Sequence, residues 1–557
     1  MFGFFKRKSS SADDQDPLSD LKTVSRWLEN LPTGDIYSAQ EQVVQNLIQF
    51  NHAGLAMSRD RLLALMHLDE QARDMQYSLC LQYLRNPRMS KVIESRLWAA
   101  IHAFYWEITR GYHAFLMDFV ANPGGSRIQQ HIPLIAARAL RGFGDIFKWR
   151  YFRYERAEEK LWLRMHNIFR ISEFDSFQQN RLKLYEQESA PSSCMDEYSR
   201  ALLLSPLGTG SLTPRQIEMV DRWLAGWSSL YGLDSTYGPE RHFFIVDTAH
   251  GLGLRRIRTQ KTTEPTYRYL DTHRLLTHLD ETVHALQGGA MPASLGLGED
   301  FRLPDGYDLI AHVRNEWSPA NTRERRASPR ESVDGRCEVV PELRNIAARM
   351  QRDQQIATGV HASQSLTPEE ILDIKLYGFV TQRTKAGVSQ RLAAADDHML
   401  EHWALRDRSE TGVGIALKDE QSEWVRVGKL LALRPDPSGP WRIGIVRRIT
   451  RQEEGWRLLG VRVLPGVAEH AGILQDADQQ TASYAVDGPA FGAEEPAIPA
   501  LIYPDSEGGP RIILETARYA HGRQYLLRHA DQVLQIQLES VLDKGDGWLL
   551  ASYQRLN

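Results

Sequence analysis

Two short stretches of the sequence carry side chains suited to binding phosphates and purines. The first, RERRASPR at residues 323–330, holds four arginines in eight positions, and Arg326 and Arg330 are spaced as R-x-x-x-R. The second, DRSETG at residues 407–412, has the form D-x-S-x-x-G and runs into the alternating segment VGIAL. Guanidinium groups bind phosphate oxygens bidentately and stack on purine faces. Carboxylates accept hydrogen bonds, serine donates or accepts them, and glycine lets a flat ligand come close.

The bulk composition requires any such recognition to be local. The chain has 557 residues and a formal net charge of −4, with 42% hydrophobic and 25% charged residues. This length exceeds a single core and predicts about three to four domains. A slightly negative protein lacks the general attraction to nucleic acids or membranes that a basic protein has.

The cysteines and the hydropathy pattern predict a cytoplasmic protein. Three widely spaced cysteines, Cys80, Cys194 and Cys337, exclude a disulfide scaffold and a cysteine-rich zinc site. They are typical of a reducing compartment. Because no run of eighteen apolar residues occurs, no transmembrane segment is expected.

The first half of the chain has the pattern of a helical domain. We expect a disordered tail over 1–19 and a mainly α-helical domain over 20–287, with a division into two subdomains near 200 left open. Helix starts are expected at two capping boxes, SAQE at 38–41 and TPRQ at 213–216. Helical runs are expected at 92–120, 132–170, 174–188 and 272–287, with the extended pieces HFFIVD and TYRYLD between 240 and 272.

The second half has the alternating pattern of antiparallel strands. A Gly-, Pro- and Arg-rich linker is expected over 288–322, after which the hydrophobic period changes from 3.6 to 2. The pattern predicts a small barrel or sandwich over 323–466, with a helical insertion at about 345–400 outside it. A second linker over 467–494 and a C-terminal β unit over 495–557, ending in the hairpin KGDGW, complete the chain.

The two motifs and the strands around them resemble the PilZ domain, a family of small β-barrels that bind cyclic di-GMP. The segments VGKLLALR, WRIGIVR and GVRVL match its strand order and hydrophobic pattern. The resemblance covers about 323–466 without the insertion. It implies a PilZ-like antiparallel β-barrel for this region. Together with the periodicity of the rest of the chain, this predicts a multidomain α+β fold with a large α-helical N-terminal half and a second small β unit after the barrel.

The resemblance also implies a set of ligand-binding residues. These are Arg326, Arg330, Asp407, Ser409 and Gly412, with Arg325 as a weaker neighbour. The implied ligand is cyclic di-GMP, and no cofactor or metal is expected. One departure from the family is the spacing of its two motifs, since 81 positions (407 − 326) separate Arg326 from Asp407. The insertion between them could cover the binding face, reshape it or leave it open.

Other candidate motifs are weaker. The segment FKWRYFRYER at 147–156 suits either single-stranded nucleic acid or an amphipathic core helix, and the negative net charge favours the helix. His273 and His278 would lie about 140° apart on a helix, which is unsuitable for a shared metal. The GLGL segment at 251–254 lacks the third glycine of a dinucleotide fingerprint, and no nucleophile signature occurs. Nothing therefore predicts an enzyme.

The sequence thus predicts a cyclic di-GMP receptor. Nucleotide binding would change the arrangement of the barrel and the helical half, which would engage an unidentified protein partner and no nucleic acid. The alternative is a nucleotide-independent scaffold whose degenerate barrel serves protein–protein contacts. Binding stoichiometry and oligomeric state are left open.

Overall fold

The computed structural model describes residues 16–556 with gaps and divides the chain into two compact units, Met1–Arg323 and Glu324–Asn557. The gaps are residues 33, 55–56, 87–88, 125–126, 209, 258–263, 303–304, 320–329, 359–367, 378, 380, 385–399, 437, 453–454, 476–496, 505–508 and 531. The tail over 1–15, Arg325 and Arg326 lie outside the described residues. Within the described ranges, no helix is long and apolar enough to cross a bilayer.

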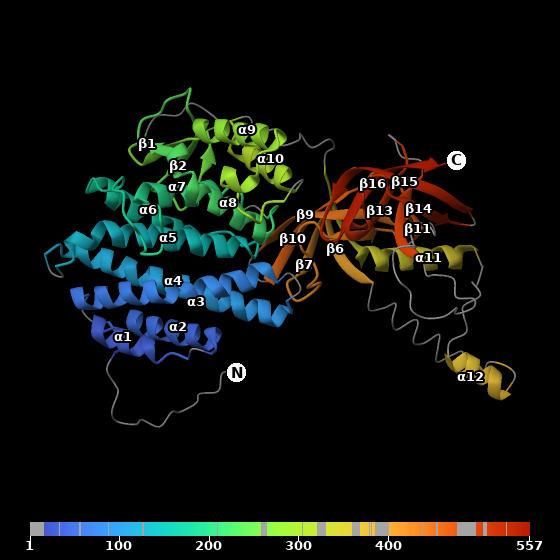
Figure 1. Cartoon of the computed structure of the whole chain (residues 1–557), viewed down its shortest axis with the longest axis horizontal. Helices are drawn as coiled ribbons and strands as arrows, with labels where there is room; N and C mark the ends of the chain where they lie inside the picture. The colour runs from blue at the N-terminus through green and yellow to red at the C-terminus, as the bar shows by residue number, and fades with distance from the viewer. Residues whose placement is uncertain are drawn as a thin grey trace. The chain divides into compact units, whose positions relative to one another are not determined.

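The first unit is a helical domain with one small sheet (Figure 1). Its helices are α1 (Leu21–Glu29), α2 (Ile36–His52), α3 (Arg59–Arg85), α4 (Lys91–Ala121), α5 (Ile132–Tyr151), α6 (Glu159–Phe174), α7 (Cys194–Leu204), α8 (Pro214–Gly226), α9 (His273–Gln287) and α10 (Asp305–Trp317). Its strands, β1 (Gly232–Asp234), β2 (His242–Asp247), β3 (Arg255–Arg256) and β4 (Tyr267–Asp271), form a sheet in the order β1-β4-β2-β3. Helix α4 packs against α2, α3 and α5, and a single apolar core runs through the unit.

The aromatic and basic segment at 147–156 is part of this core. It forms the end of α5, and Phe147, Trp149 and Tyr151 are all buried. Arg153, just after the helix, stacks over the ring of Trp98 at 4.8 Å. The segment therefore contributes packing, as an amphipathic helix does.

Several helix boundaries differ from the expectation. The capping box at Thr213 is confirmed, but α2 begins before Ser38, because the Asp35 carboxylate accepts from the backbone N–H groups of Tyr37 and Ser38. An upstream aspartate is an equally good cap, so Ser38 falls inside the first turn. The run expected at 132–170 is divided into α5 and α6. The helix expected at 174–188 is wrong, since α6 ends at Phe174 and a series of turns follows.

The linker expected over 288–322 is wrong in its second half, which forms α10. Leu309, Ile310, Val313 and Trp317 of this helix are buried in the helical core. The Trp317 indole Nε1 donates to the carbonyl of Leu203 at 3.0 Å. The Gly- and Pro-rich flanks concealed a short amphipathic segment whose apolar residues recur at helical spacing.

The second unit contains two closed barrels and confirms the α+β architecture. The first barrel comprises β5 (Glu331–Pro341), β6 (Glu401–Ser409), β7 (Gly412–Lys418), β8 (Leu430–Arg434), β9 (Arg442–Arg451) and β10 (Trp456–Val463). The second comprises β11 (Glu469–Gln475), β12 (Ile498–Tyr503), β13 (Arg511–Glu515), β14 (Gln524–His529), β15 (Gln532–Lys544) and β16 (Trp548–Leu556). Strand β11 lies where a linker was expected over 467–494, so that prediction is wrong for its first residues.

The two barrels have the same strand order. Around the first barrel the order is β5-β6-β7-β10-β9-β8, and around the second it is β11-β12-β13-β16-β15-β14. Counted along the chain, both read first, second, third, sixth, fifth, fourth. The C-terminal β unit is therefore a second barrel of the same topology.

The insertion between β5 and β6 contributes to the packing of both barrels. Its first helix, α11 (Leu343–Thr358), packs against β5 and β8 of the first barrel and against β11, β12 and β13 of the second. Ile346 and Ala347 of this helix are fully buried in an apolar cluster that both barrels share. The Asp353 carboxylate of α11 accepts from the Trp441 indole at 2.9 Å. A second helix, α12, spans Pro368–Tyr377, while residues 359–367 and 385–399 lie outside the described residues.

Candidate functional site

The hairpin of β6 and β7 positions the D-x-S-x-x-G residues. Ser409 and Gly412 are Cα partners across the turn, and the Ser409 hydroxyl donates to the Gly412 carbonyl at 3.1 Å. The ladder register shifts between Leu405 and Asp407. Leu405 points into the barrel and is buried, whereas the Asp407 side chain is 31% exposed on the outer face. The bulge thus directs the carboxylate outward.

The Asp407 carboxylate lies directly over Gly414 of β7. A Cβ atom built on Gly414 would be 2.6 Å from Oδ2 of Asp407, closer than real contacts allow. At Gly412, a Cβ atom would lie 3.1 Å from the Val461 carbonyl oxygen. Both positions favour glycine because only a bare backbone leaves room for these neighbours.

Arg330 reaches the same place from a distant part of the sequence. It immediately precedes β5, which pairs with β6 so that Ser332 lies opposite Asp407. Nη1 of Arg330 is 2.8 Å from Oδ1 of Asp407. One strand pair therefore brings together two motifs that the insertion separates in the sequence. Arg325 and Arg326 fall outside the described residues.

The ion pair of Arg330 and Asp407 is weak enough to exchange. The two side chains are 36% and 31% exposed. Exposed pairs of this kind contribute about 0.2–1 kcal/mol. Another anion, such as a phosphodiester group, can therefore take the place of the carboxylate at little cost.

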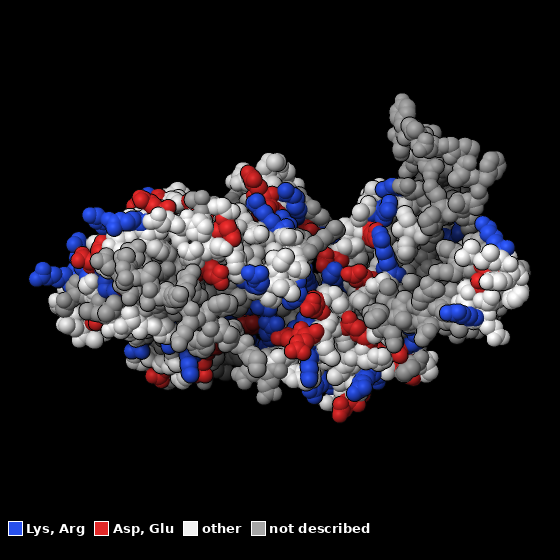
Figure 2. Space-filling model, turned by 90° about the horizontal axis from the view of Figure 1, so that it is seen from below, with Lys and Arg blue, Asp and Glu red and all other residues white. Residues whose placement is uncertain are grey.

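Helix α11 of the insertion packs on strands other than those of this hairpin. Helix α11 lies against β5, β8 and the second barrel, whereas the motif is carried by β6 and β7, with β10 beside them. Basic and acidic side chains are interspersed on the molecular face shown in Figure 2.

Two family models match the chain. The N-terminal domain of the cyclic-di-GMP receptor FimW matches residues 22–236, and the middle PilZ domain of that receptor matches residues 341–470. The PilZ match covers most of the first barrel, which is therefore a PilZ domain. The PilZ match includes Asp407, Ser409 and Gly412 but begins after Arg330. A comparison with the curated proteins gives no match.

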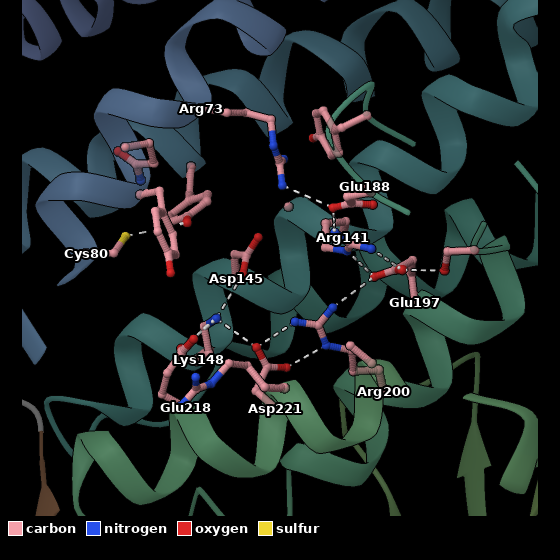
Figure 3. Close-up of a pocket in the computed structure, with 18 of the residues that line it drawn as sticks. Arg73, Cys80, Arg141, Asp145, Lys148, Glu188, Glu197, Arg200, Glu218 and Asp221 are labelled. Atoms are coloured by element: carbon pink, nitrogen blue, oxygen red, sulfur yellow. Dashed lines mark hydrogen bonds and ion pairs between the residues drawn. The ribbon is translucent and has the colours of Figure 1, made fainter. Parts of the chain in front are cut away.

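A separate cavity of about 950 Å³ lies in the helical unit, far in sequence from the PilZ barrel (Figure 3). Charged side chains from α3, α5, α7 and α8 line it. The Asp221 carboxylate accepts from both Arg200 Nε and Nη2, at 2.5 and 2.6 Å, and from Lys148 Nζ at 2.7 Å. Arg141 Nη1 donates to Glu188 at 2.8 Å.

The charges of this cavity are paired with one another. Every charged residue labelled in Figure 3 forms an ion pair with another labelled residue. Burial would raise the pKa of Asp221, but Arg200 and Lys148 hold it below its usual value. Burial raises the pKa of Glu218, which shares Lys148 with Asp221. Removing one partner of such a buried pair costs about 3–5 kcal/mol, because the other charge is then left buried without compensation.

This network is not predictable from the sequence, because its members are dispersed between residues 69 and 300. No short motif marks them. His278, which was considered as a metal ligand, packs against the ring of Trp227. In the described ranges no group of three or more His, Cys, Asp or Glu side chains could hold a metal ion.

Proposed function

We propose that this chain is a cyclic di-GMP receptor whose PilZ barrel binds the nucleotide. The binding residues are Arg326, Arg330, Asp407, Ser409 and Gly412, with Arg325 beside them. The observation that carries the proposal is the 2.8 Å contact of Arg330 with Asp407, which joins the arginine motif to the D-x-S-x-x-G hairpin. Both matching family models describe a cyclic-di-GMP receptor, which supports the same function.

The chemistry of the site suits this ligand. Cyclic di-GMP has two phosphates for the arginines, and two guanines whose N–H groups can donate to Asp407. Each charge-assisted hydrogen bond contributes about 1.5–3 kcal/mol. Two well-placed arginines could therefore supply most of a micromolar affinity, which corresponds to about −8 kcal/mol.

Isothermal titration calorimetry of the full chain with cyclic di-GMP tests the proposal. We expect micromolar or tighter binding that is lost in Arg326→Ala/Arg330→Ala. The control is Arg555→Ala, which removes an exposed arginine of β16 in the second barrel and should leave the affinity unchanged. A well-folded wild-type protein that gives no binding would refute the receptor and favour the alternative, a scaffold with a degenerate barrel.

The proposed response is a change in how the helical unit is held. Binding would draw residues 323–330 across the barrel face, and these residues join the two units. Small-angle scattering with and without saturating cyclic di-GMP should then differ. An unchanged scattering profile in a protein that binds the nucleotide would refute this response but not the receptor.

The remaining features of the proposal follow from the receptor role. The chain would act without catalysis, and the helical unit, which is similar to the FimW N-terminal domain over residues 22–236, would engage a protein partner. The chain would act in a reducing compartment such as the cytoplasm, and its three free cysteines support this proposal.

A further inference from the structure

The outer face of the PilZ barrel continues beyond the D-x-S-x-x-G hairpin as a row across four strands. Asp407 of β6 lies opposite Gly414 of β7, Gly414 opposite Gly460 of β10, and Gly460 opposite Arg448 of β9. Neighbouring strands are about 4.8 Å apart, so three steps separate Asp407 and Arg448 by about 14 Å. A carboxylate and a guanidinium thus stand at opposite ends of a strip whose middle has no side chains.

Gly460 is the open part of this strip. Among the described residues, only Cβ of Arg448, at 3.4 Å, would lie within 4 Å of a Cβ atom added at Gly460. Gly460 also has no positive φ, so its backbone does not require glycine. A glycine inside a strand weakens the strand and often marks a place where a ligand approaches the backbone closely.

A second row beside the first repeats the arrangement. Ser409 lies opposite Gly412, and Gly412 lies opposite Arg462 of β10. Arg462 is paired with Asp543 of the second barrel, which also accepts from Arg447 at 2.6 Å. Hydrogen-bonding groups of β6 therefore face arginines of β9 and β10 across three glycines, of which Gly460 is the partly exposed one.

We infer that Gly460 forms the floor of a purine slot in this barrel and that Arg448 forms its far wall. This inference rests on the proposed function and extends the site beyond the two motifs. One guanine ring lies flat on the Gly460 backbone, with its N–H edge toward Asp407. Arg448 at the opposite end contacts the ring face or an adjacent phosphate.

The substitution Gly460→Val separates binding from folding. Valine is favoured in strands and suits the ordinary φ at this position, so the melting temperature of the protein without ligand should be unchanged or higher. The added methyl groups would occupy the slot, and we expect the Kd for cyclic di-GMP to rise at least about ten-fold. If Gly460→Val lowers the melting temperature, the same comparison is made with Gly460→Ala, which adds a single methyl group.

A second variant tests the wall. Arg448→Ala should raise the Kd about ten-fold without a change in melting temperature. The control is Lys418→Ala, because this exposed cation lies at the other end of β7, away from the rows of the slot. It should bind as the wild type does.

The outcomes distinguish this inference from the proposed function. The slot is supported if Gly460→Val and Arg448→Ala both weaken a binding that Arg326→Ala/Arg330→Ala abolishes. If the wild type binds and both slot variants bind within about two-fold of it, the slot is refuted and the receptor stands. If the wild type itself does not bind, the receptor proposal fails, and the slot fails with it.

Discussion

The two barrels share one strand order but use the same outer face in opposite ways. The rows are counted from the turn that joins the second and third strands of each barrel. In the first barrel, the third row consists of Asp407, Gly414, Gly460 and Arg448. In the second barrel, the row on the same four strands is Leu501, Ile513, Leu550 and Asp543. The three apolar members of the second row are at most 5% exposed, within the cluster that joins the barrels.

This difference shows that one topology can carry two chemically different outer faces. Apolar side chains make the face of the second barrel a docking surface, packed against α11 and residues such as Trp441 and Ile443. Glycines and charged groups leave the equivalent face of the first barrel polar and partly bare. The fold therefore does not determine function, which depends on the residues of the face. We expect all nucleotide to bind to the first barrel.

Truncating the docking face should produce the largest effect. Leu550→Ala removes a buried side chain from the shared cluster, and such substitutions cost about 2–5 kcal/mol of the free energy of unfolding. Urea denaturation of the full chain measures the change. Val533→Ala on β15, where the side chain is 55% exposed, is the control and should have little effect. A loss below about 1 kcal/mol for Leu550→Ala would show that this face does not hold the barrels together.

Filling the bare face of the first barrel should weaken nucleotide binding rather than folding. Gly414→Ala would place a methyl group against the Asp407 carboxylate, which must then leave the position proposed for accepting guanine N–H groups. We expect about ten-fold weaker binding of cyclic di-GMP, or about 1.4 kcal/mol. Calorimetry on Gly414→Ala, Asp407→Ala and the double variant measures the coupling. If the two effects add fully, the clash with Asp407 is not the cause.

The sequence predicted the parts of this comparison that are local. The alternation of Val413, Ile415 and Leu417 indicated a strand with one buried face, and all three are buried. Closure of the barrel was harder to predict from the sequence, because the insertion separates the paired strands β5 and β6 in the chain. Strand β11 was missed because EHAGILQ, with its small residues, opens a stretch rich in Ala, Gly and Asp.

The candidate site was predictable only where a motif marks it. The contact of Arg330 with Asp407 follows from strand pairing, although the PilZ resemblance had already placed both residues in one site. Gly460 and Arg448 belong to no motif. Their positions opposite Asp407 depend on strand register, including a shift between Gly460 and Val461, which sequence spacing does not reveal.

The contact between the barrels at Asp543 should have a smaller effect. Asp543→Asn removes the charge that pairs with Arg447 and Arg462, whose side chains are 40% and 46% exposed. The free energy of unfolding should fall by no more than about 1 kcal/mol. Binding of cyclic di-GMP should tighten about two-fold, because Arg462 beside Gly412 would no longer be neutralised.

The matched control for this variant lies on the same hairpin. Asp546→Asn removes the partner of Lys429, at 3.0 Å, and should leave nucleotide affinity unchanged. Calorimetry at low and high salt compares the two variants, since an electrostatic gain should diminish as salt increases. Equal affinities for Asp543→Asn and wild type at low salt would mean that Asp543 of the second barrel does not affect nucleotide affinity at the first barrel.

The smallest effect is expected at the turn of the PilZ hairpin. Ser409 and Gly412 form the first pair after this turn, whereas the second barrel has the buried Tyr503 opposite Arg511. Ser409→Ala loses the 3.1 Å hydrogen bond to the Gly412 carbonyl. This partly buried hydrogen bond contributes about 0.5 kcal/mol to the free energy of unfolding. Because the same hydroxyl is proposed to face the nucleotide, affinity should fall about two-fold, and Ser409→Thr should restore it. If Thr restores stability but not affinity, the hydroxyl supports only the turn, and the difference between the barrels at this pair is structural.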